Sequence, residues 1–126
     1  ALSLAAMRAT LSKVLTKEAF PRMVSAAERW TAGVDKVITE FAMPWYVTRL
    51  GCRAEYQFSP TPPKNGTQAH DAMDFELERL MHLYAMNRGI LLTPFHNMAL
   101  MSPQADPEDV DQHTRVFREA VKELVA

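Results

Sequence analysis

The chain has 126 residues and a formal net charge of −1, and 48% of its residues are hydrophobic. This length suits a single domain spanning residues 1–126, and the hydrophobic content is high enough for a packed core. The near-neutral charge argues against nucleic-acid binding, which needs a basic face. A membrane span requires about 18 consecutive apolar residues, and no apolar run in the sequence is that long.

The first residues begin directly in helical sequence. Leu2–Leu15 carries Leu4, Met7 and Leu11 at helical spacing among alanines, which favour helix. The segment lacks the charged start and the cleavage site of a signal peptide. Because an N-terminus usually has some slack before its first helix, we expect this chain to be cut from a longer protein.

A long second helix is predicted from Thr16 to about residue 41. Thr16 is its expected N-cap, and Pro21 fits only the first turn because proline has no N–H to donate. Its predicted apolar stripe comprises Phe20, Met23, Val24, Ala27, Thr31, Val34, Val37, Ile38 and Phe41.

Two strands are predicted next, at Tyr46–Leu50 and Arg53–Phe58, joined by a hairpin at Gly51-Cys52. The second strand alternates apolar and polar residues, as a half-buried strand does. The stretch 59–69 contains three prolines and an Asn-Gly pair, which together predict a loop.

The last third of the chain predicts a helix, short strands and a final helix. Asp71 is expected to cap a helix that Gly89 ends with a left-handed residue. Ile90–Leu92 and Met98–Met101 have the composition of short strands. The run Asp106–Asp109, with proline second, is typical of a helix start, and the buried residues expected on this last helix are Val110, His113, Phe117, Ala120, Val121 and Leu124.

The order of elements predicts an α/β domain of the α+β type. Because the strands lie close in sequence with helices outside them, we expect a small, mostly antiparallel sheet of three to four strands with helices on one face.

The sequence contains no pattern that predicts a metal site or a nucleophile. The only cysteine is Cys52, which excludes a disulfide framework and favours a reducing cytoplasm. Acidic pairs such as Glu76 and Glu78 are expected on exposed helix faces. A zinc site needs three or four converging ligands. The sequence does not predict one, because no two histidines are spaced i, i+4 on one helix; they stand far apart, at His70, His82, His96 and His113.

The segment Phe95-His96-Asn97-Met98 is the strongest candidate for binding. Thr93-Pro94 stiffens the chain before it, and the strand after it fixes its end. His96 and Asn97 offer hydrogen-bonding groups at the tip of a loop. From the residues alone, a binding role and a purely structural role are both open.

Several segments resemble the C-terminal part of class III aminotransferases, the pyridoxal-phosphate (PLP) enzymes that include glutamate-1-semialdehyde aminomutase. Leu4–Leu11 resembles the helix that follows the family's active-site region. Trp45–Gly51 and Arg53–Tyr56 resemble the first two strands of its small domain. Asn87–Leu92 and Asp109–Asp111 resemble parts of its closing strand, loop and helix.

The resemblance implies that this chain is the small domain covering one side of an active-site cleft. PLP, its Schiff-base lysine and the acid at its pyridine nitrogen would then belong to a preceding domain, and residues 1–16 would form the linking helix. The parent enzyme would move an amino group between an amino compound and a keto acid or aldehyde. The isolated chain would bind no PLP and would be inactive.

The resemblance also bears on individual residues. Many class III transaminases carry a carboxylate-binding arginine where Met98 stands, and the aminomutase subgroup carries a glutamate where Asn97 stands. No catalytic, cofactor-binding or metal-binding residue is therefore assigned to this chain. Phe95, His96, Asn97 and Met98 are expected only to line the substrate, whose carboxylate would be recognised by residues outside the chain.

A free-standing α/β binding or interaction module without catalytic activity is the alternative. A PLP domain encoded in frame before Ala1 would favour the enzyme, whereas a start codon close to Ala1 would favour the module. The expected partners are the missing N-terminal PLP domain and a small-molecule amino donor and acceptor. Self-association is also expected, through exposed apolar residues at Leu2, Leu4, Met7 and Leu11.

Overall fold

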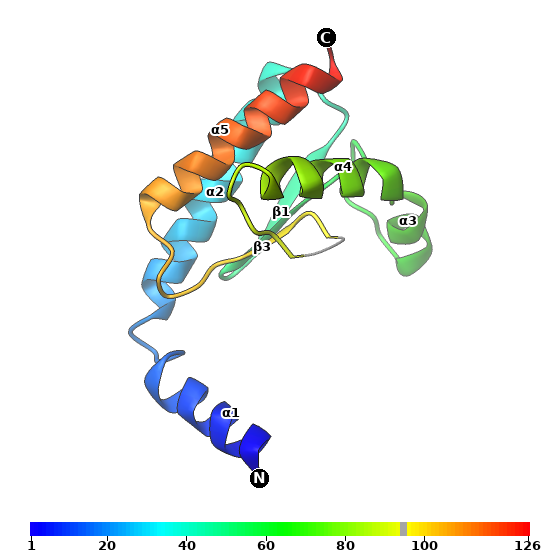
Figure 1. Cartoon of the computed structure of the whole chain (residues 1–126). Coiled ribbons are helices and arrows are strands. Elements are labelled where there is room, and N and C mark those ends of the chain that lie inside the picture. The colour runs from blue at the N-terminus through cyan, green and yellow to red at the C-terminus, as the bar shows by residue number, and fades with distance from the viewer. Residues whose placement is uncertain (94–95) are drawn as a thin grey trace.

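The computed structural model describes residues 1–93 and 96–126 (Figure 1). Its elements are α1 (Leu2–Lys13), α2 (Phe20–Glu40), β1 (Tyr46–Leu50), β2 (Arg53–Gln57), α3 (Gly66–Asp71), α4 (Phe75–Met86), β3 (Met98–Leu100) and α5 (Pro107–Leu124). In Figure 1, α1 extends away from the remaining elements, while α2 and α5 lie side by side along the sheet. No helix in the described part of the chain is long and apolar enough to cross a membrane.

The three strands form one antiparallel sheet in the order β1-β2-β3, which confirms the predicted α+β class. Val47 on β1 lies opposite Tyr56 on β2, and Ala54 on β2 lies opposite Ala99 on β3. The predicted hairpin is also confirmed: Gly51 has a φ of 59°, a left-handed conformation that glycine adopts without strain.

The strand predicted at Ile90–Leu92 is wrong, because this segment does not join the sheet. The Ile90 N–H instead donates to the Ala85 carbonyl at 3.0 Å, which closes the end of α4. Gly89 has a φ of 79°, as predicted for the residue that reverses the chain after a helix. The backbone donor that a strand would need is thus already used by the helix end.

The core lies where α2 and α5 meet the inner face of the sheet. Trp30 is 1% exposed, and its ring centroid lies 6.1 Å from that of Tyr56. The Tyr56 ring lies 4.8 Å from Phe117 of α5, so one aromatic cluster joins both helices to β2. Trp30 is absent from the predicted stripe of α2, although it is among the most deeply buried residues.

Two predicted helix starts are wrong. The helix α2 begins at Phe20 rather than near Thr16, whose carbonyl accepts the Ala19 N–H at 3.1 Å in a preceding turn. Pro21 does lie in the first turn, as predicted. The helix α4 begins at Phe75 with Asp74 as its cap, because the Asp74 carboxylate, and not that of Asp71, accepts the Leu77 N–H, at 3.0 Å.

Asp71 ends the short helix α3, which lies largely in a stretch predicted to be a loop. The Asn65 side chain caps α3 by accepting the Gln68 N–H at 2.9 Å. The predicted start of α5 is confirmed with a full capping box. The Asp106 carboxylate accepts the Asp109 N–H at 3.0 Å, and the Asp109 carboxylate accepts the Asp106 N–H at 3.1 Å.

Candidate functional site

The loop predicted to line a substrate leads into β3. Phe95 lies outside the described residues. The His96 N–H donates to the Thr93 carbonyl at 3.3 Å, and the Thr93 N–H donates to the Met98 carbonyl at 3.4 Å. Thr93 therefore pairs with the backbone at His96 and at Met98, the residue at which β3 begins.

The structure brings His96, Asn97 and Met98 together beside β2, but it exposes them to different degrees. His96 is exposed, Asn97 is only 4% exposed, and Met98 is half-buried opposite Glu55. The Asn97 carbonyl accepts the Tyr56 N–H at 3.2 Å, which anchors the loop to the core strand. Of these three, His96 is the side chain most available to a ligand.

Glu78 of α4 is a buried acid that sequence reasoning placed on an exposed face. It is 5% exposed, so that expectation is wrong. The helix starts at Phe75 rather than Asp71, and Glu78 shares its buried face with Met81 and Ala85 at helical spacing. The spacing of three residues from Glu78 to Met81 and four from Met81 to Ala85 is the sequence pattern that could have predicted the burial of Glu78.

The carboxyl group of Glu78 lies in an unusual electrostatic environment. Burial raises its pKa, the nearby His96 imidazole lowers it, and Glu55 and Asp74 raise it further. Its Oε2 atom has no hydrogen-bond partner among the described residues. A buried acid next to an exposed imidazole can orient a polar ligand or hold a proton, yet neither group is a nucleophile for forming a Schiff base.

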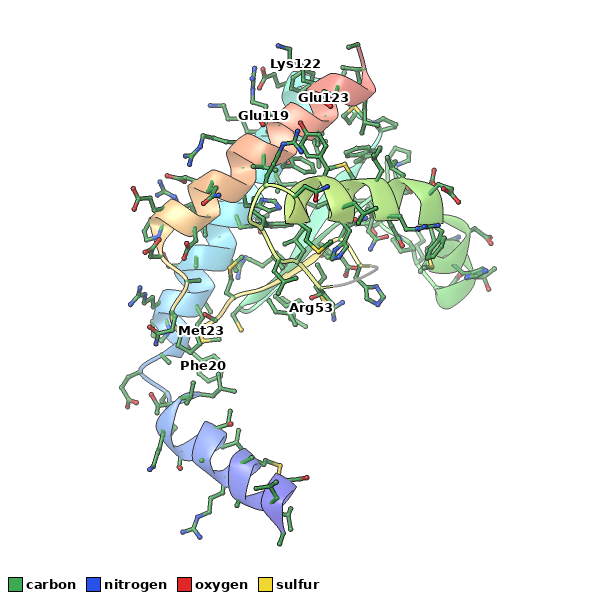
Figure 2. All side chains as sticks on the ribbon, viewed as in Figure 1. Phe20, Met23, Arg53, Glu119, Lys122 and Glu123 are labelled. Carbon is green, nitrogen blue, oxygen red and sulfur yellow. The ribbon has the colours of Figure 1, made fainter. Side chains whose placement is uncertain are left out.

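The lysines of the chain do not fit the requirements of PLP, which needs a lysine in an enclosed site with an acid and a phosphate cradle. Every lysine is exposed, and Figure 2 shows Lys122 near the far end of α5. They come from separate elements or connections of the fold: Lys13, Lys17, Lys36, Lys64 and Lys122. Residues 1–93 and 96–126 also contain no group of three or more His, Cys, Asp or Glu side chains placed to hold a metal.

Comparison with known proteins first identifies the class of fold. No family model and no curated protein matches the chain. An omega-transaminase from Sphaerobacter thermophilus is 22% identical, with a TM-score of 0.74 over 89% of this chain and 26% of that one. A beta-phenylalanine aminotransferase from Variovorax paradoxus is 19% identical, with a TM-score of 0.78 over 91% of this chain and 26% of that one. These likenesses show that the chain has a fold found within aminotransferases.

A nearer likeness identifies the family. A glutamate-1-semialdehyde aminomutase from Pseudomonas aeruginosa PAO1 is 48% identical, with a TM-score of 0.93 over 98% of this chain. A variant of that enzyme in complex with PMP matches at the same identity with a TM-score of 0.92. The chain spans only 27% of the length of these relatives. It belongs to the aminomutase and aminotransferase family, as the resemblance predicted, and corresponds to about a quarter of such a protein.

Proposed function

We propose that this chain is the small C-terminal domain of a PLP-dependent class III aminotransferase or aminomutase. The observation that carries the proposal is the 48% identity over 98% of the chain to a glutamate-1-semialdehyde aminomutase. Because the match spans 27% of that relative, a single domain comprising residues 1–126 fits beside a larger catalytic domain.

The proposed parent protein moves an amino group between an amino compound and a keto acid or aldehyde. PLP supplies the electron sink for this chemistry when it is bound. The exposed lysines of this chain do not fit a cofactor site, so the chain alone is inactive and binds no PLP. Its contribution is to cover one side of the substrate cleft.

The loop Phe95–Met98 lines the substrate in this proposal. The exposed His96 imidazole is the group able to bond a polar substrate atom, while the buried Asn97 and the half-buried Met98 carry no charge. A substrate carboxylate is therefore recognised by residues outside this chain.

The helix α1 links this domain to the PLP domain in the proposed parent. Its apolar side chains are exposed by 54 to 85%, at Leu2, Leu4, Met7 and Leu11. An exposed apolar surface of this kind supports contact with another domain or another copy of the protein. We therefore propose the PLP domain as a partner and a homo-oligomeric parent. A cytoplasmic location is proposed on a separate ground, the presence of a single cysteine, Cys52.

The test compares this 126-residue chain with the longer product of the gene that encodes it. We expect only the longer product to show the visible absorbance of protein-bound PLP, its loss on borohydride treatment, and amino-group transfer. Amino transfer by the 126-residue chain alone would overturn the proposal. A gene product that starts at Ala1 would instead support a free-standing binding module.

Substitution of the loop tests the substrate-lining role separately. In the longer product, His96→Ala should raise KM several-fold with kcat little changed, because a lost contact of equal strength in ground and transition states affects binding alone. His70→Ala removes another exposed imidazole, from α3, and should leave both constants unchanged. Equal kinetics for the two variants would exclude a substrate contact by His96.

A further inference from the structure

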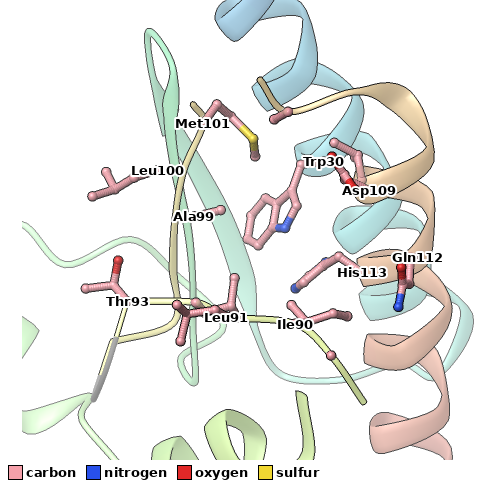
Figure 3. A pocket seen from close by; sticks show the side chains of 14 residues that line it. Trp30, Ile90, Leu91, Thr93, Ala99, Leu100, Met101, Asp109, Gln112 and His113 are labelled. Carbon is pink, nitrogen blue, oxygen red and sulfur yellow. The ribbon is translucent and has the colours of Figure 1, made fainter. Parts of the chain in front are cut away.

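A pocket of about 300 Å³ lies between the segment 89–93, β3 and the first turns of α5 (Figure 3). This volume is at the lower end of the range for small-molecule sites. Most of the side chains that line it are apolar, among them Ile90, Leu91, Leu92, Ala99, Met101 and Val110.

Two of the residues that line this pocket each have a buried polar atom without a hydrogen-bond partner in the described structure: Trp30 Nε1 and His113 Nδ1. Trp30 is 1% exposed and His113 is 5% exposed, and their ring centroids lie 5.0 Å apart. In Figure 3 the two rings lie next to each other in the space between β3 and α5. Because a buried donor or acceptor without a partner is destabilising, a ligand that bonds both atoms gains free energy from each.

Two other polar side chains at the pocket, those of Gln112 and Asp109, already make hydrogen bonds within the protein. The Gln112 Nε2 donates to the Arg88 carbonyl at 3.3 Å. The Asp109 carboxylate accepts the Asp106 N–H in the capping box of α5. Trp30 and His113 are therefore the buried residues at this pocket whose unused hydrogen-bonding capacity a ligand could satisfy.

The chemistry of these two atoms limits what the pocket can hold. The indole N–H only donates, so the ligand must present an acceptor. Burial lowers the pKa of His113 to about 4, so the imidazole is neutral near pH 7 and its Nδ1 either accepts or donates according to its tautomer. A hydroxyl oxygen satisfies either tautomer, because it accepts from Trp30 and either donates to or accepts from His113. An ammonium group has only donors and cannot accept from the Trp30 N–H. An anion would lie near the Asp109 carboxylate with no cation among the residues that line the pocket, which is costly.

We propose that this pocket binds a small uncharged molecule with an apolar body and one hydroxyl group, held by Trp30 Nε1 and His113 Nδ1. The proposal does not rest on the proposed enzymatic function.

The test follows the indole N–H resonances of the ¹⁵N-labelled 126-residue chain during titration with cyclohexanol. Trp30 should shift saturably, whereas Trp45, which is not among the pocket residues, should not. Cyclohexanecarboxylate and cyclohexylammonium have the same apolar ring with a charge in place of the hydroxyl, and they should leave Trp30 unshifted. Equal binding of the three compounds, or no saturable Trp30 shift with cyclohexanol, would overturn the proposal.

Variants test the two named contacts. His113→Phe keeps a ring but removes Nδ1 and should weaken cyclohexanol binding about tenfold, which is the loss of one hydrogen bond. The same change at the exposed His70 should leave binding unchanged. Unchanged binding by a folded His113→Phe variant would exclude the contact.

A second variant tests the site without altering the core. Leu91 is 80% exposed at the pocket, so Leu91→Trp should fold normally and obstruct cyclohexanol. Leu50, which is 81% exposed on β1, is the matched position for the same substitution. Binding that survives Leu91→Trp as fully as Leu50→Trp would place the ligand elsewhere and overturn the proposal.

Discussion

The helices α1 and α2 both contain apolar residues but differ in their surroundings and in how strongly these residues are concentrated on one face, which is far more marked in α2. Each carries apolar residues at helical spacing, yet α2 buries seven residues and α1 buries none in the described structure. The stripe of α2 packs against α5 and the sheet, whereas Leu4, Met7 and Leu11 remain exposed. Periodicity therefore predicts a helix and its apolar face, but it does not show what covers that face.

The two helices also differ in how their formation is supported. The helix α1 has 12 residues and no side-chain cap among the described residues, a length at which isolated helices are marginal in water. The helix α2 has 21 residues and is stabilised by packing against the rest of the fold. We therefore expect substitutions of buried residues in α2, α5 and the sheet to lower the free energy of unfolding strongly. Substitutions in α1 should change it little.

The largest effect is expected at Trp30. Because this side chain is 1% exposed in the core, Trp30→Ala should lower the free energy of unfolding by about 3–5 kcal/mol, measured by urea denaturation. Leu4→Ala in α1 removes a side chain that is 65% exposed and should stay within about 0.5 kcal/mol of the parent sequence. Similar losses for both would mean that α1 is packed in solution.

The next effect is a dependence of stability on pH. Burial lowers the pKa of His113 from 6.5 to about 4, so between these values the unfolded chain binds more protons than the folded one. The free energy of unfolding therefore has its full value above pH 6.5 and falls by roughly 3 kcal/mol as the pH falls towards 4, because protonation favours the unfolded chain.

Urea denaturation between pH 4 and 7 measures how the free energy of unfolding depends on pH. His113→Phe cannot be protonated, so its free energy of unfolding should fall less over the same range. His70→Phe, at an exposed position, is the control and should keep the full dependence. A slope unchanged by His113→Phe would assign the effect to other groups.

A smaller effect is expected at the start of α5. Asp106→Ala removes the carboxylate that accepts the Glu108 and Asp109 N–H groups, and should cost about 1 kcal/mol in denaturation experiments. Asp35→Ala, at an exposed position inside α2, makes the same change without removing a cap. Equal losses would show that charge, and not capping, determines the result.

The smallest effect on stability is expected from changes to the apolar face of α1. Replacing Leu4, Met7 and Leu11 together with Gln should change the free energy of unfolding by less than about 0.5 kcal/mol. The same variant should lower the average mass in light scattering, because these side chains form the surface proposed for self-association. An unchanged mass would locate any self-association on another surface.

Much of the fold could be predicted because local signals agreed with the packing. Gly51 and Gly89 adopt the left-handed conformations that their positions predict, and the capping box of α5 forms as expected. The start of α4 could not be decided locally, because Asp71 and Asp74 are both good caps and only packing selects between them. With Asp74 as the cap, α4 buries Glu78, so the prediction that this acid lies on an exposed helix face failed.

The candidate site was less predictable than the fold. The sequence identified the segment that contains His96 and Asn97, but the burial of Asn97 depends on its carbonyl pairing with Tyr56 across the sheet. The pocket beside Trp30 and His113 joins residues more than 80 positions apart, and no local pattern brings them together. Whether the loop lines a substrate stays a prediction.

The most direct test of the proposed relationship to PLP enzymes is to locate the cofactor on the longer gene product. Borohydride reduction links PLP to its Schiff-base lysine, and peptide mass mapping then identifies that lysine. We expect the adduct on a lysine that precedes Ala1. An adduct on any lysine of this chain, such as Lys36 or Lys64, would contradict the account.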